Sequence, residues 1–265
     1  MLKKPGHLAA FLVALSACTT VPLHPDRPEL STGSRAVVGA ISLELVPLRT
    51  GHRTRPSCAP ARVHSCFGTT QIVYGAYRVR HPRGTFLIDA GLSKHAAPEL
   101  SGFPFKEREV LAHDEDPSLG DALRTVGDPH LDFVLLTHSH WDHSDELADP
   151  TNPHLLVGPG EADFSAHLET SASSILREVK LVRYDVSSFA WDGPGYEGFS
   201  ASHDWFHDGS VVLVPLPGHT PGSVGSFLNS VHGRRLLFVD DTAWSTWCRG
   251  NTRRPAARGR PPGWE

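Results

Sequence analysis

Apolar and polar side chains alternate along much of the chain beyond residue 36, as expected of half-buried β-strands. Residues 37–48 and 70–80 are rich in β-branched side chains and predict one or two strands and a further strand, respectively. Residues 81–84 (HPRG) contain both residue types that break regular structure and predict a turn, after which residues 85–88 form a strand. The domain is therefore expected to begin with a hairpin.

Longer periods and unbroken apolar runs follow this hairpin. Residues 118–126 carry apolar side chains at every third or fourth position, which predicts a helix, and residues 161–179 predict a second one. Residues 131–137 are mostly apolar, which is typical of a strand covered on both faces. Four more strands are predicted at residues 154–157, 211–216, 223–229 and 235–239, the last two joined by a turn at His232-Gly233.

Composition narrows the function classes. The 265 residues carry a formal charge of −4 and can bury a substantial core. Residues 247–265 contain five arginines and one glutamate without an apolar period, so they predict a disordered tail and leave the body more acidic than the total. An acidic body argues against a nucleic-acid partner.

The N-terminus has the features of an export signal. Two lysines precede an apolar stretch that is too short to span a bilayer. Leu15-Ser16-Ala17-Cys18 resembles the lipobox of bacterial lipoproteins, which implies a signal peptide at 1–17, acylation of Cys18 and a location in the cell envelope. Residues 18–35 then form a tether. The alternative is that the apolar stretch is a buried N-terminal helix.

Export would place the remaining cysteines in an oxidising compartment. Cys58 and Cys66 are close enough in sequence to close a short disulfide loop, and two free thiols are the alternative. Cys248 lies in the predicted tail. The spacing of the cysteines does not indicate a cysteine zinc site.

Metal-binding side chains cluster directly after the apolar run at 131–137. His138 and His140 lie two residues apart and face the same way in an extended chain, and Asp142 and His143 follow where a helix should begin. Imidazole and carboxylate groups together bind zinc, or less selectively iron or manganese. Two other strand ends carry His219, in a Pro/Gly-shaped turn, and Asp240-Asp241. A chance grouping of surface residues among 17 histidines is the alternative.

These residues resemble the metallo-β-lactamase-fold hydrolases over roughly residues 37–244, and residues 206–222 are most similar to acyl-homoserine lactonase-like members. The resemblance implies an α/β fold, the four-layer αββα sandwich, over a domain at 36–246. It further implies one or two metal ions, with the following ligands: His138, His140 and His219 for the first, Asp142 and His143 for the second, and Asp241 as a bridge.

Two more positions match the family only in part. Asp89 lies in the family's Asp-x-Gly segment, where it either supports the loop or is a plain turn aspartate, and Asp240 stands where glycine is more usual. The family's final metal-binding histidine has no counterpart, because no histidine follows His232. We therefore expect an incomplete second half of the sandwich, weak metal retention and a truncated or frame-shifted reading frame.

The function expected from this resemblance is hydrolysis of a small ester, lactone or lactam by a zinc-activated water. Asp142 would orient the nucleophile or carry its proton to the leaving group. Tyr184 and Tyr196 lie where a tyrosine could contact substrate, although packing roles also account for them. The alternatives are a metal-binding lipoprotein without turnover and a non-functional fragment. The sequence leaves the oligomeric state open.

Overall fold

The computed structural model describes residues 41–56, 68–92, 112–127, 130–148, 154–167 and 185–242. The predicted leader, the tether, all four cysteines and the arginine-rich tail lie outside these ranges, as do both predicted ends of the domain. Within the described ranges, no helix combines the length and the apolar character needed to span a membrane.

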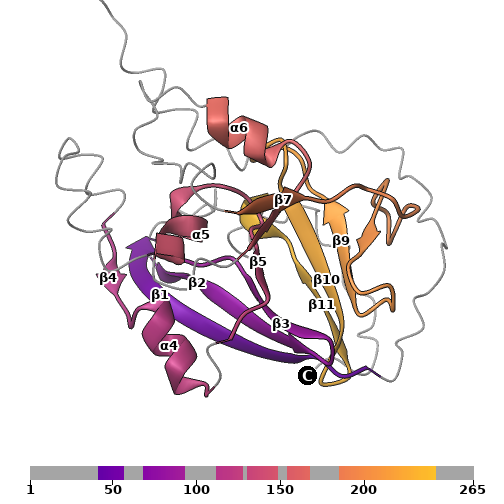
Figure 1. Ribbon diagram of the computed structural model, residues 1–265. Helices are drawn as coiled ribbons and strands as arrows, with labels where there is room; N and C mark the ends of the chain where they lie inside the picture. Colours follow the sequence, from indigo (N-terminus) through magenta and orange to yellow (C-terminus); the bar gives the residue numbers. More distant parts are fainter. Residues whose placement is uncertain are drawn as a thin grey trace, which may run out of the picture.

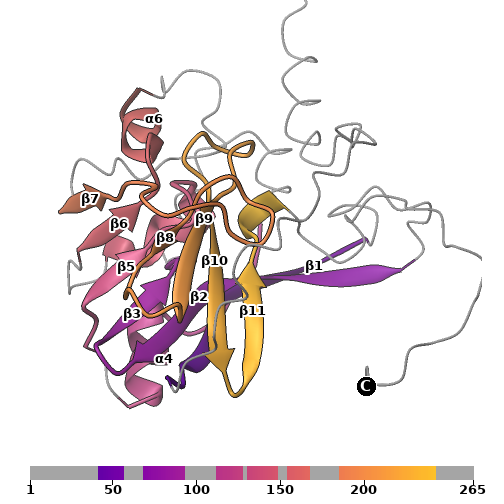
Figure 2. The same ribbon diagram turned by 90° about the vertical axis from the view of Figure 1, so that its right-hand side faces the viewer.

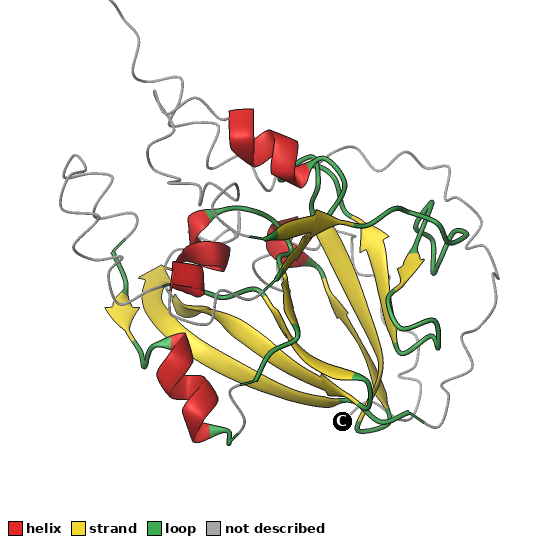
Figure 3. Ribbon diagram, in the orientation of Figure 1, coloured by secondary structure: helices red, strands yellow, loops and turns green. Residues whose placement is uncertain are grey.

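Two β-sheets packed face to face make up the described structure, with helices at the periphery (Figures 1 and 3). The first sheet has seven strands in the order β4-β1-β2-β3-β5-β6-β7, and the second has four in the order β11-β10-β9-β8. In chain order the elements are β1 (Glu44–Pro56), β2 (Thr69–His81), β3 (Gly84–Ile88), β4 (Asp114–Glu115), α4 (Leu119–Thr125), β5 (Phe133–Leu135), α5 (Trp141–Ser144), η1 (Asp145–Ala148), β6 (Leu155–Val157), α6 (Glu161–His167), β7 (Val186–Ser188), β8 (His203–Asp204), β9 (Val211–Pro215), β10 (Val224–Val231), β11 (Arg234–Phe238) and η3 (Asp240–Thr242).

Strand direction brings several chain segments to one edge of both sheets. Strands β3, β5, β6 and β7 are mutually parallel, so the segments that follow them leave the first sheet at the same edge. In the second sheet β10 runs antiparallel to both β9 and β11, so the segments after β9 and β11 also leave together. The amide of Val224 donates to the carbonyl of Thr137 at 3.0 Å and joins the two sheets at this edge.

The main core fills the space between the sheets. Phe86 and Ile88 of β3 pack there against Leu213 and Leu228 of the second sheet, all at most 1% exposed. A second apolar cluster lies on the outer face of the first sheet, where Leu119 and Leu123 of α4 cover the strands. Removing this apolar surface from water is the main favourable contribution to folding.

Ser118 determines where α4 begins. Its hydroxyl accepts a hydrogen bond from the amide of Asp121 at 3.2 Å, as an N-cap residue does. The helix therefore occupies nearly all of the predicted range 118–126. The structure describes the second predicted helix only from Glu161 to His167, and the rest of 161–179 lies outside the described residues.

Strands β2 and β3 form the predicted hairpin, but strand β1 is longer than the sequence indicated. Strand β1 continues to Pro56, so the predicted end at residue 48 is wrong. The strand pairs with β2 as far as Pro56 and Thr69, whereas β3 pairs only with residues 77–81 of β2. The outer half of the β1–β2 pair therefore extends beyond β3 (Figure 2). Sequence alternation fails there because burial does not require apolar side chains on a projecting arm.

Strand β5 and the short elements also differ from the prediction. Only Phe133–Leu135 of the predicted 131–137 run is paired as β5. The short strands β4, β7 and β8 were not predicted, whereas α5 lies where the sequence indicated that a helix begins. Elements of two to four residues are too short to show a period, and their conformation depends on tertiary contacts.

At the opposite end of the sheets, a buried histidine joins the β2–β3 turn to the β8–β9 turn. The amide of Arg83 donates to Nδ1 of His81 at 3.0 Å, which leaves Nε2 to donate to the Asp208 carboxylate at 3.1 Å. The ring stacks on Phe206 with 3.8 Å between centroids. Burial lowers the pKa of His81 from its ordinary value of 6.5, although Asp208 partly opposes this shift.

We predict that His81→Phe lowers the free energy of unfolding by about 1–3 kcal/mol at pH 7.5, because it removes two hydrogen bonds and keeps the stacked ring. The gap between the variant and the wild type should narrow as the pH falls below 6.5. A depressed pKa means that the unfolded wild type takes up the proton first, so acid destabilises the wild type more than the variant. Chemical denaturation of both proteins between pH 5 and about 7.5 measures this, and a constant gap would contradict it.

Candidate metal centre

A strained turn after β3 supplies the carboxylate at the base of the site. Asp89 has a left-handed backbone with φ 60°, and it is 7% exposed. Its carboxylate accepts the amide and the hydroxyl of Thr137 at 2.8 and 2.9 Å, and it contacts Nδ1 of His143 at 2.9 Å. Asp89 thus fixes the ring of His143 so that Nε2 faces away from it. Left-handed aspartate is uncommon, and such strain concentrates at functional sites.

The loop after β5 carries the first histidines. His138 is fully buried and His140 is 7% exposed. His140 is the N-cap of α5, with extended backbone angles, and the helix then turns His143 back toward His138. The two rings lie 4.2 Å apart between centroids. The cluster in the sequence therefore folds into a compact group because a helix begins within it.

His219 and Asp241 come from the second sheet. His219 lies in the turn after β9, and its Nε2 is 2.8 Å from Nδ1 of His140. Asp241 follows β11 in η3, and its two carboxylate oxygens lie 3.5 Å from Nε2 of His143 and 3.5 Å from Nε2 of His219. Asp241 therefore sits between the two histidines, in the place expected of a bridging ligand.

Two groups of potential ligands result, with all donor atoms of each group within 4.8 Å of one another. His138, His140 and His219 form one, and His138, His143 and Asp241 form the other. Asp142 lies beside the second group, with a carboxylate oxygen 3.9 Å from Nε2 of His143. The side chain of Asp240 lies outside the described part of the structure.

The first group suits a cation better than a network of hydrogen bonds. Nδ1 of His140 faces Nε2 of His138 at 2.9 Å and Nε2 of His219 at 2.8 Å. An imidazole nitrogen carries either one hydrogen or one lone pair, so Nδ1 can satisfy only one of these neighbours. A tetrahedral zinc, with Zn–N bonds of about 2.0–2.1 Å, holds its nitrogens about 3.3 Å apart, so a small expansion would accommodate it.

The electrostatics of the two groups differ. Burial, reinforced by the neighbouring imidazoles of His138 and His219, lowers the pKa of His140 to about 3, so its ring is neutral and keeps a lone pair at physiological pH. Burial also acts to lower the pKa of His143, but the carboxylates of Asp89, Asp142 and Asp241 outweigh it and raise the pKa well above the ordinary value. The carboxylates around His143 therefore favour a positive charge at this position, which a proton or a divalent cation can supply.

The pKa values of Asp142 and Tyr74 are also shifted by burial and by neighbouring carboxylates. Burial raises the pKa of Asp142, and Asp241 adds to this shift. Burial and the carboxylate of Asp142 raise the pKa of Tyr74 to about 12, which places this phenol near the site. Tyr74 packs edge-on against His113 at 6.0 Å, and His113 lies 6.2 Å from Trp141. Ring contacts thus link Tyr74 through His113 to Trp141, the first residue of α5.

Sequence reasoning missed two contributors to the site. Glu161 was noticed only as a helix start, yet it is fully buried and hydrogen-bonded to both histidine loops. Tyr74 was noticed only as part of a strand. An acid at the first turn of a helix normally interacts with the helix dipole, so the sequence held no signal that Glu161 points inward.

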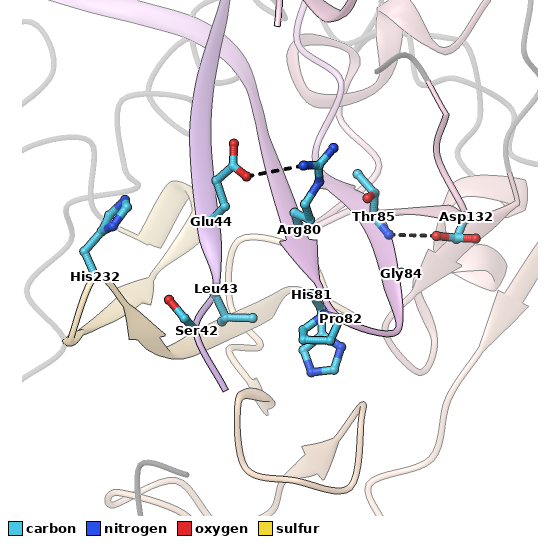
Figure 4. A pocket seen from close by; sticks show the side chains of 10 residues that line it. All are labelled: Ser42, Leu43, Glu44, Arg80, His81, Pro82, Gly84, Thr85, Asp132 and His232. Atoms are coloured by element: carbon cyan, nitrogen blue, oxygen red, sulfur yellow. Dashed lines mark hydrogen bonds and ion pairs between the residues drawn. The ribbon is translucent and has the colours of Figure 1, made fainter. Parts of the chain in front are cut away.

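Two other features lie away from the ligands. Tyr196 packs on Phe227 at 5.1 Å, and its hydroxyl contacts Asn229 and Arg235, which is a packing role; Tyr184 lies outside the described residues. A hollow of about 670 Å³ opens at the far end of the first sheet (Figure 4). Its lining includes the ion pair of Glu44 and Arg80, and none of the predicted ligands.

The sequence of this chain is similar to those of known proteins. Residues 75–246 match the model of the metallo-beta-lactamase superfamily. A probable metallo-hydrolase of Mycobacterium tuberculosis is 32% identical over 118 residues, which are 41% of this chain and 36% of that protein. The N-acyl homoserine lactonase AttM of Agrobacterium fabrum is 23% identical over 179 residues, 64% of each chain. The match therefore spans about a third of the mycobacterial protein and less than two thirds of AttM.

Solved structures share the fold. An N-acyl homoserine lactone hydrolase with N-hexanoyl-L-homoserine at its catalytic metal centre superposes with a TM-score of 0.56 at 18% identity, covering 77% of this chain and 76% of that one. A probable metal-dependent hydrolase from Staphylococcus aureus gives a TM-score of 0.55 at 15% identity, covering 76% and 74%. The two packed sheets, the ligands gathered at one edge and the family match agree: this chain belongs to the metallo-beta-lactamase superfamily.

Proposed function

We propose that this protein is a metal-dependent hydrolase that cleaves a small ester, lactone or lactam with a metal-activated water. The observation that carries the proposal is the convergence of His138, His140 and His219 in one largely buried group, where Nδ1 of His140 lies within 2.9 Å of a ring nitrogen of each of the other two. Zinc fits this ligand set best, and iron or manganese are compatible with it.

The proposed ligands divide between two positions. His138, His140 and His219 would hold the first ion, His143 and Asp142 the second, and Asp241 would bridge them. Ions of this kind, once bound, would lower the pKa of a water molecule to about 7 and would polarise a substrate carbonyl. The contribution of Asp89 is to hold the ring of His143 with its free nitrogen toward the site.

Asp142 is the proposed general acid–base residue. It is held at the start of α5, beside the second group of ligands. From this position its carboxylate can take a proton from the nucleophile and pass it to the leaving alkoxide or amine. A positioned carboxylate of this kind contributes roughly 10²–10⁴-fold to a rate.

A lactone is the substrate to test first. One curated relative is named as an N-acyl homoserine lactonase, and structural neighbours are described as lactone hydrolases. In this chain the partly exposed ring of Tyr74, whose pKa the carboxylate of Asp142 raises, offers aromatic surface near the site, which suits an ester or lactone with an apolar substituent.

Asp89→Asn should weaken zinc binding at the second position by about 10–100-fold, because an amide replaces the carboxylate that orients His143. The number of zinc ions per chain after dialysis against a weak chelator measures this. Asp132→Asn is the matched control, since Asp132 accepts the amide of Thr85 at the opposite end of the sheet. Equal zinc content in both variants would contradict the assignment.

Zinc-loaded protein should hydrolyse at least one of an acyl-homoserine lactone, a β-lactam and an aryl ester. His138→Ala should abolish this turnover, because His138 belongs to both groups of ligands. A strong chelator should do the same, and added zinc should restore the rate. The control is His130→Ala, whose side chain is 73% exposed.

Retention of activity in His138→Ala would place the chemistry elsewhere. Tightly bound zinc without cleavage of any of the three substrates would instead support a metal-binding protein without turnover. Each result is read from the same preparations, by metal analysis and by initial rates.

A further inference from the structure

Glu161 is the first residue of α6, and its side chain is fully buried between two loops. One carboxylate oxygen, Oε1, accepts the amide of Ser139 at 2.7 Å and its hydroxyl at 2.6 Å. The other, Oε2, accepts the hydroxyl of Thr220 at 2.6 Å and the amide of Gly222 at 3.1 Å. Ser139 and Thr220 are adjacent to proposed ligands in the chain, and Gly222 lies three residues after His219.

The two oxygens of this carboxylate accept hydrogen bonds from loops that follow strands of different sheets. Ser139 lies between His138 and His140, in the loop that follows β5 of the first sheet. Thr220 follows His219 directly, in the turn after β9 of the second sheet. One charged side chain therefore connects the segment that carries two of the histidines to the segment that carries the third. Hydrogen bonds to a charged acceptor are about twice as strong as neutral ones.

Close backbone packing shows that this connection is built into the fold. A Cβ atom on Gly222 would lie 2.6 Å from the backbone nitrogen of Glu161, so only glycine fits there. A Cβ atom on Gly158, in the turn before α6, would overlap the carbonyl oxygen of Gly222. The helix start is thus pressed against the His219 turn, and Glu161 has little freedom to move away.

We propose that Glu161 is a positioning residue that sets the distance between His219 and the pair His138 and His140, and thereby the affinity and geometry of the first metal position. This inference rests on the proposed metal centre but not on turnover. Glu161 does not face the ligands' nitrogens; it acts through the backbones of Ser139, Thr220 and Gly222.

The test compares Glu161→Gln with Asp163→Asn. Gln keeps the shape and one acceptor oxygen, but its NH₂ group faces the backbone amide of either Ser139 or Gly222, so the side chain can no longer accept an amide hydrogen from both loops. Asp163 is exposed on the same helix, and its substitution removes the same charge without touching the loops. Both proteins are titrated with Co²⁺, whose visible absorption reports the ligand geometry, and with Zn²⁺ in competition with a chelating dye.

We expect Glu161→Gln to bind Zn²⁺ about 10–100-fold more weakly than the wild type and to change the Co²⁺ spectrum, as loss of an orienting partner does. Asp163→Asn should match the wild type in both. Thr220→Val, which removes only one bond to Oε2, should weaken binding less, and its effect should be smaller in the Glu161→Gln background because both substitutions act on the same hydrogen-bond network.

Failures of the inference and of the proposed function give different results. If Glu161→Gln binds Co²⁺ and Zn²⁺ just as the wild type does, the positioning role is overturned and the hydrolase proposal stays intact. Weaker binding in the variant, with no turnover by either protein, would overturn the hydrolase and support the positioning role. The positioning role of Glu161 would also be rejected if the effects of Glu161→Gln and Thr220→Val on metal affinity were fully additive. A wild type that binds neither metal would reject it as well.

Discussion

The structure depends on a constraint at one edge of its two sheets, where three imidazole nitrogens meet in a buried space. Nδ1 of His140 lies within 2.9 Å of a nitrogen of His138 and of His219, and it cannot satisfy both as a donor or as an acceptor. His138 and His140 are buried and His219 is largely buried, so a shared cation would use the lone pairs of all three rings.

The sheets are built so that this meeting can occur. Parallel strands β3, β5 and β6 deliver Asp89, the histidine loop and Glu161 to the same edge, and β9 and β11 deliver His219 and Asp241 from the other side. The bond between Val224 and Thr137 joins the two sheets there. Two buried carboxylates contact the segments that carry the histidines. Asp89 bonds to the ring of His143, and Glu161 accepts hydrogen bonds from Ser139 and Thr220, the neighbours of the histidines in the chain.

Sequence patterns predicted the larger elements and several ligands that lie together in the chain. The first hairpin, α4 and the strands that lead to His138 and His219 were all indicated by periodicity and turn residues, because burial of one face imposes a period. The far half of β1 and the short strand β8 were missed, since a projecting arm and a two-residue strand carry no such period. Tyr74 was missed because its approach to Asp142 is a contact between distant segments.

The sequence by itself determined which side chains could bind a metal, because imidazole and carboxylate chemistry is local and the cluster from His138 to His143 is contiguous. Only the tertiary structure decided that Asp241 lies between His143 and His219, and that Glu161 turns inward to the loops on both sheets. The physical reason is that these distances depend on how the two sheets pack and on where their strands end. Packing of this kind is a property of the whole core, which no short stretch of chain encodes.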